Sequence, residues 1–364
     1  MKILGIETSC DDTAAALIEA RSPGYFRIIA ERRSSQIDIH KQYGGVVPEL
    51  AARAHAELVM PLITEVLAGK KPDVIAVTAG PGLITALMVG VQTAASLSYA
   101  WDVPLVAVNH IEGHIYGNWL APKQKIVFPA LALIVSGGHT ELILMRDHGH
   151  YKLIGKTRDD AAGECFDKVG KLLGFEYPGG PKIAQEAAAG NAATISFPRP
   201  MINSPDFDFS FAGLKTAALY WLREYAQTVI SSERSESRNL IGEIPRLRPD
   251  YVGTPLGMTL TRHFCASFEQ AIVDVLVAKT LRAVKEYQPK TVLLGGGVAA
   301  NTRLRTTLTK TVSTVYPKVA LTLPPLFATV DNALMIAVAG YFHAKRTDFT
   351  SWKKISAQPN WRIA

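Results

Sequence analysis

The chain has few cysteines and no long hydrophobic run. These two features argue against a disulfide-rich protein and against a membrane-spanning protein. It contains Cys10, Cys165 and Cys265 in 364 residues, far apart and without C-x-x-C spacing. This pattern argues against a disulfide framework and a zinc ribbon, and it is expected in a reducing compartment. No apolar run approaches the ~18–20 residues that a membrane-spanning helix needs.

The beginning of the sequence also lacks the features of a secretory signal peptide. Residues 2–7 form a short apolar segment that ends at a polar turn, without an h-region or a cleavage site. Together with the cysteines, this predicts a cytoplasmic protein that has no membrane contact. The apolar fraction of 48% and charged fraction of 20% indicate a well-packed globular chain. Its length predicts two lobes rather than one core.

The chain carries a formal net charge of +7. A basic surface of this kind is compatible with a polyanionic partner such as nucleic acid. Charge alone does not decide the matter, because many basic proteins bind no nucleic acid. The tail after residue 345 is also basic and contains Trp352 and Trp361. These tryptophans would suit either base stacking or simple docking of the tail onto the protein.

Alternating strand and helix patterns predict an α/β protein. We expect strands at 2–7, 14–18, 73–78, 105–108, 131–135, 141–145, 151–158, 291–294 and 319–323, and helices at 48–68, 83–99, 162–173 and 260–287. The hairpin over 2–18 has a counterpart over 131–145, which suggests a duplicated architecture. Both turns are rich in small and hydroxylated residues, which favours phosphate contact through backbone N–H groups, although ordinary tight hairpins explain them equally.

The segment His110-Ile-Glu-Gly-His114 is the strongest single motif. Histidines at i and i+4 lie on one face of a helix, the spacing with which a helix binds one metal ion. Glu112 occupies a different position from the glutamate of the zinc-protease pattern H-E-x-x-H, so it points away from the metal face. Two packing histidines would give the same pattern. The pair follows a strand at 105–108, and open α/β sheets bind ligands at that end of their strands.

Three further features could contribute to a site. Glycine-rich turns at 80–82, 178–181 and 295–297 permit close approach of a ligand, or merely tight packing. Asn301 follows the last of these turns and could bond a nucleotide. Asp331 precedes the final helix, where it would serve either as the helix N-cap or as an oxygen ligand beside the two histidines.

Many of these segments recur together in one family. They are Gly5–Thr13, Gly44–His55, Asn109–His114, Val135–Thr140, Phe166–Lys171, Tyr177–Pro181, Phe209–Thr216, Gly295–Asn301 and Asp331-Asn332. The chain resembles the tRNA N6-adenosine threonylcarbamoyltransferases, formerly described as O-sialoglycoprotein endopeptidases, from residue 1 to about residue 343. The segment 231–257 is longer than expected for the family, and the tail after 343 matches no family pattern.

The resemblance implies an actin-like fold of the sugar kinase and Hsp70 type, with two duplicated lobes and a cleft between them. We expect residues 1–125 with 326–345 to form the first lobe and residues 128–325 the second. A mobile excursion would span 231–257, and residues 346–364 would form a basic tail.

The resemblance also implies a set of site residues. His110, His114 and Asp331 would hold one divalent metal ion per subunit, iron or zinc. Asp11 would lie near the reacting end of the substrate. The expected substrate-binding positions are Ile134, Val135, Ser136, Gly137, Gly138, Asp167, Gly180 and Asn301.

The implied activity is that of an acyltransferase in tRNA modification. It would transfer the threonylcarbamoyl group from threonylcarbamoyl-AMP to the exocyclic amine of the adenosine beside the anticodon, in tRNAs that read codons beginning with A. Expected partners are tRNA and accessory pathway proteins: in bacteria, a paralogous actin-like subunit and a small ATPase. The alternatives are a metal-dependent glycopeptidase, a kinase of the same fold and a nucleotide-binding scaffold.

Overall fold

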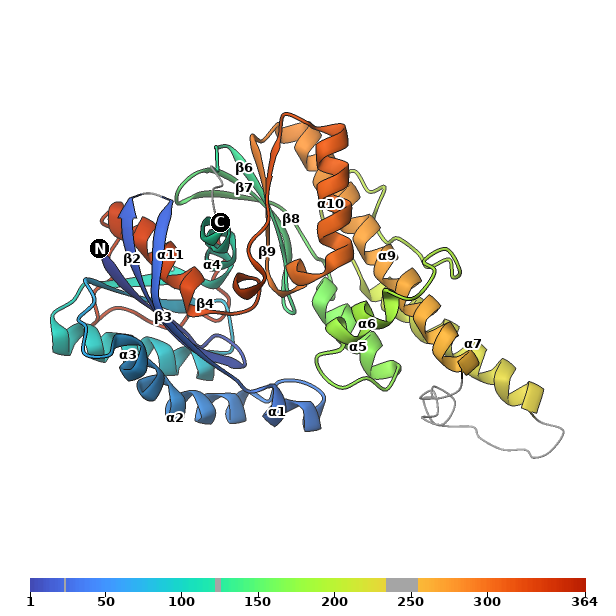
Figure 1. Ribbon diagram of the computed structural model, residues 1–364, viewed down its shortest axis with the longest axis horizontal. Coiled ribbons are helices and arrows are strands. Elements are labelled where there is room, and N and C mark those ends of the chain that lie inside the picture. Colours follow the sequence, from blue (N-terminus) through green and yellow to red (C-terminus); the bar gives the residue numbers. More distant parts are fainter. Residues whose placement is uncertain (23, 122–125, 234–254) are drawn as a thin grey trace.

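A computed structural model describes residues 1–22, 24–121, 126–233 and 255–364 (Figure 1). Most of the segment 231–257, for which the sequence predicts a mobile excursion, lies outside the described residues. Within the described part, no helix combines the length and the apolar composition that a membrane span requires.

Two five-stranded sheets form the framework, and they have the same topology. The first has the order β3-β2-β1-β4-β5 and the second β10-β9-β6-β7-β8. In each, the first strand pairs antiparallel with the second and parallel with the fourth. The strands are β1 (Lys2–Glu7), β2 (Asp12–Ser22), β3 (Tyr25–Ser35), β4 (Val74–Gly80), β5 (Leu105–Asn109), β6 (Ala130–Val135), β7 (Thr140–Asp147), β8 (His150–Lys156), β9 (Thr291–Gly295) and β10 (Ala320–Thr322).

The predicted duplication and α/β class are therefore confirmed. The helices are α1 (Ile37–His40), α2 (Pro48–Leu67), α3 (Ile84–Trp101), α4 (His110–Tyr116), α5 (Ala162–Leu172), α6 (Gly179–Ala187), α7 (Ala212–Glu233), α9 (Pro255–Tyr287), α10 (Thr302–Val315) and α11 (Ala333–Lys345). We propose that the lobes divide as the sequence predicts, with residues 1–125 and 326–345 around the first sheet and 128–325 around the second.

Alternate residues of β1 face opposite sides of the first sheet, and helices cover both sides. Leu4 and Ile6 lie in one core cluster with α2 and α3, whereas Ile3 lies in another with α4 and α11. This second cluster also contains Ala132 and Ile134 of the second sheet. Helices α4 and α11 therefore lie where the cores of the two sheets meet, as Figure 1 shows.

The tail after α11 docks on the first sheet, against its edge strand β5 and the end of β4. The Thr350 N–H donates to the Leu105 carbonyl at 2.8 Å, and the Gln358 N–H donates to the Ala79 carbonyl at 2.7 Å. Trp361 is partly buried against the core between this sheet and α2–α3. Of the two roles open for the tail, the structure shows docking onto the protein.

Gly5 permits the close packing of α11 on β1. A Cβ at this position would overlap the Ala333 carbonyl oxygen and lie 2.9 Å from the Ala337 nitrogen. We expect Gly5→Ala to lower the free energy of unfolding by about 1–3 kcal/mol, because overpacking forces the backbone apart. Denaturant unfolding checks this. The matched control is Gly213→Ala, where the nearest atom would lie 3.8 Å away; equal stability losses in the two variants would contradict the packing argument.

Candidate metal centre

Helix α4 starts at the carboxyl end of β5 because Asn109 caps it. The Asn109 Oδ1 accepts hydrogen bonds from the N–H groups of Ile111 at 2.9 Å and Glu112 at 3.4 Å. The Asn109 Nδ2 donates to the Trp361 carbonyl at 3.2 Å, so the tail fixes the same residue. The strand end, the cap and the tail together determine where the first turn of α4 lies.

The structure brings the predicted metal ligands His110, His114 and Asp331 together. Their ligand atoms lie within 4.8 Å of one another. The Asp331 Oδ1 is 3.5 Å from the His110 Nε2 and 3.3 Å from the His114 Nε2. Two imidazole nitrogens and one carboxylate oxygen form a donor set that suits zinc or iron and leaves room for further ligands.

Glu7 orients His110 from the opposite side of the ring. Its carboxylate is fully buried, and its Oε2 lies 3.2 Å from the His110 Nδ1. Glu7 also accepts hydrogen bonds from the Ser9 N–H and from the Thr78 hydroxyl, which hold it in place. A proton on Nδ1 leaves the Nε2 lone pair free to bind a metal, which is the usual arrangement of a metal-ligating histidine.

His114 supports the fit of this site to a cation. Both of its ring nitrogens are buried and make no hydrogen bond, although Nε2 faces Asp331. A buried polar atom without a partner is costly, and a bound metal ion would satisfy the nitrogen that faces Asp331. The residues present therefore fit a metal.

The electrostatics of the cluster favour a negative Asp331. Burial alone would raise the pKa of this carboxyl, but His110 and His114 hold it well below its usual range. Burial lowers the pKa of His110, and the carboxylates of Asp331 and Glu7 outweigh that effect and raise it to about 9. One proton would therefore leave the cluster when a metal binds.

Asp331 is not the N-cap of the final helix, as the sequence allowed. Asn332 caps α11, and its Oδ1 accepts the Met335 N–H at 2.9 Å. Asp331 is thus released from capping and turns its carboxylate toward the two histidines, with 23% of its side chain exposed.

Asp11 lies near the metal ligands in the turn after β1. Burial raises its pKa, and the negative charge of Asp331 raises it further. Asp11 also contributes to the raised pKa of Asp167, after burial of that group. Asp11 of the first half of the chain and Asp167 of the second therefore lie close enough to interact electrostatically.

The second sheet contributes the turn between β6 and β7 to this region. Ile134 and Val135 are fully buried, so only their backbone is available to a ligand. Ser136 is also buried, whereas a Cβ on Gly137 or Gly138 would meet no atom within 4 Å. The turn thus presents bare backbone to open space, as phosphate contact requires.

Asp167 and Gly180 are in contact, whereas the Asn301 side chain makes hydrogen bonds within the protein. The Asp167 Oδ1 accepts the N–H groups of Gly179 at 2.8 Å and Gly180 at 3.2 Å. Asn301 caps α10 through its Oδ1 and donates from Nδ2 to the buried Glu269 at 2.6 Å. A ligand contact by Asn301 would therefore use its backbone or displace one of these bonds.

Three residues of this region were not predicted as site residues. Glu7 makes the contact with His110 described above. His139, in the turn after β6, has its pKa lowered to about 4 by burial and by repulsion from His110 and His114, so it lies near both. Burial raises the pKa of Tyr177, with Asp11 adding to the effect. Each belongs to a motif quoted above, which was the available signal.

Comparison with known proteins identifies the family. A family model described as tRNA N6-adenosine threonylcarbamoyltransferase matches residues 27–338. The enzyme of that name from Thermomicrobium roseum is 47% identical over 360 residues, covering 95% of this chain and 93% of the relative. The Anaeromyxobacter dehalogenans (strain 2CP-C) enzyme is 44% identical over 367 residues, covering 100% and 99%. The chain belongs to this family.

Family membership confirms the predicted activity class, a transferase that modifies tRNA. The fold has an independent counterpart. A solved structure of full-length HypF, in its phosphate- and nucleotide-bound form, matches with a TM-score of 0.55 at 13% identity, covering 96% of this chain and 47% of that one. The two-lobed, actin-like α/β fold is therefore confirmed.

The raised pKa of Asp12 predicts that the stability of the protein depends on pH. Burial raises its pKa to about 7, against the opposing effects of Ser35 and Arg33. Because the folded pKa exceeds the unfolded value, the native state binds the proton more tightly, and ionisation between about pH 4 and 7 costs stability. In metal-free wild type, the free energy of unfolding should fall between pH 4 and pH 7 as Asp12 ionises. In Asp12→Asn this fall should be smaller by about 1–2 kcal/mol, a figure reduced to allow for solvent screening.

Urea unfolding at several pH values measures this difference. The control is Asp38→Asn, since the Asp38 side chain is 91% exposed. Stability curves of Asp12→Asn and wild type that stay parallel from pH 4 to pH 7 would contradict the prediction.

Proposed function

We propose that this chain transfers the threonylcarbamoyl group from threonylcarbamoyl-AMP to the exocyclic amine of the adenosine beside the anticodon, in tRNAs that read codons beginning with A. The observation that carries the proposal is the convergence of His110, His114 and Asp331 at the carboxyl end of β5. This is where open α/β sheets bind ligands.

The reaction is an acyl transfer to nitrogen. The amine attacks the carbamoyl carbonyl carbon, the bond from that carbon to the phosphate oxygen breaks, and AMP leaves. A metal ion held by the two histidines and Asp331, iron or zinc, would supply Lewis acidity toward the donor. The Ser136–Gly138 turn would bind the AMP portion through backbone N–H groups, with Asp167 and Gly180 beside it.

Asp11 would accept the proton that the amine loses. Its raised pKa makes it a better proton acceptor than an ordinary aspartate. Its electrostatic interaction with Asp331 supports a role for it at the reacting end of a donor bound between the turn and the metal ligands.

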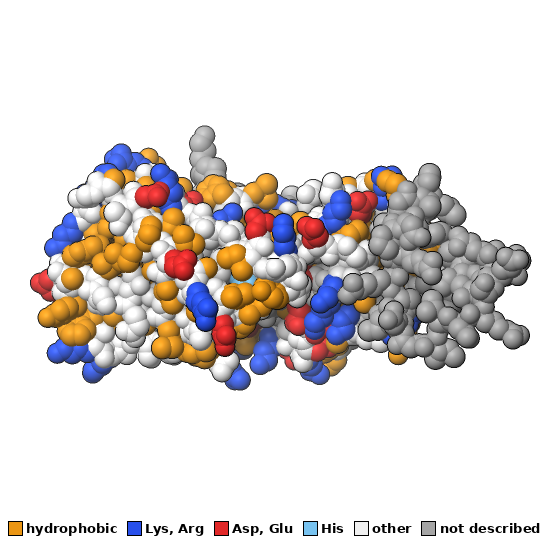
Figure 2. Space-filling view, turned by 90° about the horizontal axis from the view of Figure 1, so that it is seen from below, with side chains coloured by type: hydrophobic (Ala, Val, Ile, Leu, Met, Phe, Trp, Pro, Cys, Tyr) orange, Lys and Arg blue, Asp and Glu red, His pale blue; other side chains and the backbone are white. Residues whose placement is uncertain are grey.

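Partners beyond tRNA would dock on the outer helices. We propose a paralogous actin-like subunit and, in a bacterium, a small ATPase as accessory proteins. Exposed apolar side chains on α2 and α3 support such docking: Met60, Ile84 and Met88 are 42%, 43% and 50% exposed. Figure 2, seen from below, shows hydrophobic side chains gathered on the face where these helices lie. The three free cysteines suit a cytoplasmic location.

A metal-dependent glycopeptidase is the second candidate, and the position of Glu112 disfavours it. Both oxygens of this carboxylate bond other side chains, Tyr151 at 2.6 Å and His343 at 2.7 Å. It is therefore not available to activate water at the metal, as the glutamate of a zinc protease is.

Removal of the histidines should abolish metal binding. Anaerobically purified wild type should contain about one metal ion per chain, and His110→Ala/His114→Ala close to none, because one carboxylate alone binds weakly. Elemental analysis measures both. His150→Ala, which changes an exposed histidine, is the matched control. Unchanged metal content in the double variant would remove the proposed centre.

Reconstitution tests the reaction itself. With tRNA, purified threonylcarbamoyl-AMP and the accessory proteins, wild type should form the modified nucleoside, detected by nucleoside mass spectrometry. Asp11→Asn should lower the rate by about 10²–10⁴-fold if it accepts the proton. Absence of product with the wild type would refute the transferase mechanism, and cleavage of a sialoglycoprotein by the metal-loaded chain would favour the glycopeptidase.

A further inference from the structure

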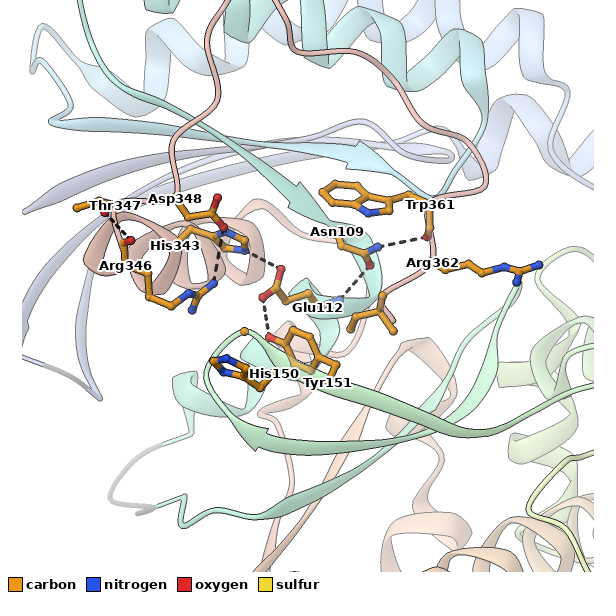
Figure 3. Close-up of a pocket in the computed structure, with 12 residues that line it drawn as sticks. Asn109, Glu112, His150, Tyr151, His343, Arg346, Thr347, Asp348, Trp361 and Arg362 are labelled. Atoms are coloured by element: carbon orange, nitrogen blue, oxygen red, sulfur yellow. Dashed lines mark hydrogen bonds and ion pairs between the residues drawn. The ribbon is translucent and has the colours of Figure 1, made fainter.

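Glu112 lies between the two proposed metal ligands in sequence, yet its side chain points away from them. The residue is 3% exposed, and its carboxylate is held on both sides. Its Oε1 accepts the Tyr151 hydroxyl at 2.6 Å, and its Oε2 is 2.7 Å from the His343 Nε2 (Figure 3). A buried carboxylate with both oxygens bonded has a fixed orientation, and so does the helix that carries it.

His343 extends this arrangement to the tail. Its Nδ1 is 2.7 Å from the Asp348 Oδ2, so the imidazole lies between two carboxylates. Two acceptors require both ring nitrogens to donate, which is the imidazolium form. The result is a chain of charge-assisted bonds from Asp348 through His343 to Glu112.

This chain connects α4 to the far end of α11. Asp331 lies just before the first turn of α11, whereas His343 lies in its last turn. A helix of this length spans about 18 Å, at about 1.5 Å per residue. Between these points Gly113 allows close contact, since a Cβ there would lie 2.8 Å from the Ile336 Cδ1. Helix α4 is thus attached to α11 at two separated points and cannot turn about either one.

Tyr151 brings the second sheet into the same arrangement. It belongs to β8, which pairs with β7, and the turn between these strands contains His148. The His148 ring stacks on Phe342 of α11 with centroids 3.9 Å apart, and its Nδ1 is 2.9 Å from the Tyr116 hydroxyl of α4. The β7–β8 hairpin therefore contacts the helix of the metal ligands and the helix that follows Asp331.

We propose that Glu112, together with Tyr151 and His343, is a positioning residue for the metal centre. It fixes the rotation of α4 so that the Nε2 atoms of His110 and His114 face Asp331, and it ties that orientation to the second sheet. The inference rests on the metal centre proposed above, but it assigns Glu112 no contact with substrate or metal.

A cavity lies beside the Glu112 carboxylate. It has a volume of about 600 Å³ and is lined by residues of β5, α4, β8, α11 and the tail, among them Asn109, Glu112, Tyr151, His343, Arg346 and Trp361. Loss of the Tyr151 or His343 contact would leave Glu112 beside this space, free to adopt other rotamers. The two histidines would then lose the orientation that Asp331 requires.

Cobalt(II) binding tests the proposal without reference to catalysis. The metal-free protein is titrated with Co²⁺, and both the dissociation constant and the d–d absorption bands are recorded, because the bands report the coordination geometry. We expect Glu112→Ala to weaken Co²⁺ binding by about 10-fold, the low end of the range for losing a group that bonds a metal ligand directly, because Glu112 acts on the histidines only through α4. The bands should also shift. Glu112→Gln, which keeps the shape and one acceptor, should restore part of the affinity.

Two further variants distinguish loss of the Glu112 contacts from a general loss of stability. Tyr151→Phe removes only a hydroxyl group, and it should weaken Co²⁺ binding several-fold. Lys279→Met removes a fully buried ammonium that bonds Ser204 and Asp206 in the second lobe, and it should leave Co²⁺ affinity and bands unchanged. Equal effects of Lys279→Met and Glu112→Ala would reduce Glu112 to a general contribution to stability and overturn the proposal.

The outcomes also separate this inference from the proposed reaction. Wild type that binds Co²⁺ through His110 and His114 but forms no modified nucleoside would refute the reaction and leave the role of Glu112 standing. Glu112→Ala with wild-type affinity and wild-type bands would overturn the inference, whatever the activity. Wild type that binds no Co²⁺ would overturn the inference together with the metal centre on which it rests, and nucleoside formation would still decide the reaction.

Discussion

The contact of Asp331 with His110 and His114 is the constraint around which the rest of the molecule is arranged. A carboxylate and two imidazoles from positions far apart in the sequence meet in a largely buried place. Burying such groups is costly unless each has a partner. Glu7 supplies a partner for His110, the histidines supply one for Asp331, and Asn332 takes over the capping that would otherwise occupy the aspartate.

The same constraint explains why α4 and α11 lie where the two cores meet. Both helices pack on the first sheet, and their core cluster also contains residues of the second. The helix that carries the two histidines and the helix that follows Asp331 are therefore held by residues of both halves of the chain. The turn after β6 corresponds to the turn after β1 in the duplicated topology, whereas the proposed metal-ligand histidines follow β5, the edge strand of the first sheet.

Much of this arrangement could be predicted from the sequence, because it depends on local patterns. The hairpins at 2–18 and 131–145 predicted the repeated topology, and the spacing of His110 and His114 predicted a shared helix face. The partner of His110, in contrast, is 103 positions away in sequence, and nothing local to Glu7 indicates that contact. The cap of α11 was ambiguous because Asp331 and Asn332 both suit that position, and only the tertiary contacts of Asp331 decide it.

Asn301 and Glu112 are two further residues whose tertiary contacts could not be predicted from local sequence patterns. An asparagine after a glycine turn suits a ligand contact, yet here its side chain closes α10 and satisfies the buried Glu269. Glu112 resembles a protease glutamate only through its neighbours in sequence. Its partners come from β8 and α11, which are brought to it by long-range packing.

The close contact of β1 with α11 has a consequence for how the protein is made. Gly5 lies against Ala333, so the first strand is covered by a helix that is synthesised more than 300 residues after it. The first half of the chain must leave the ribosome without the helix that covers one face of its sheet. Contacts of such long sequence separation form slowly and leave apolar surface exposed meanwhile. Nascent chains truncated before residue 333 should therefore depend on chaperones, although they already contain all five strands of the first sheet.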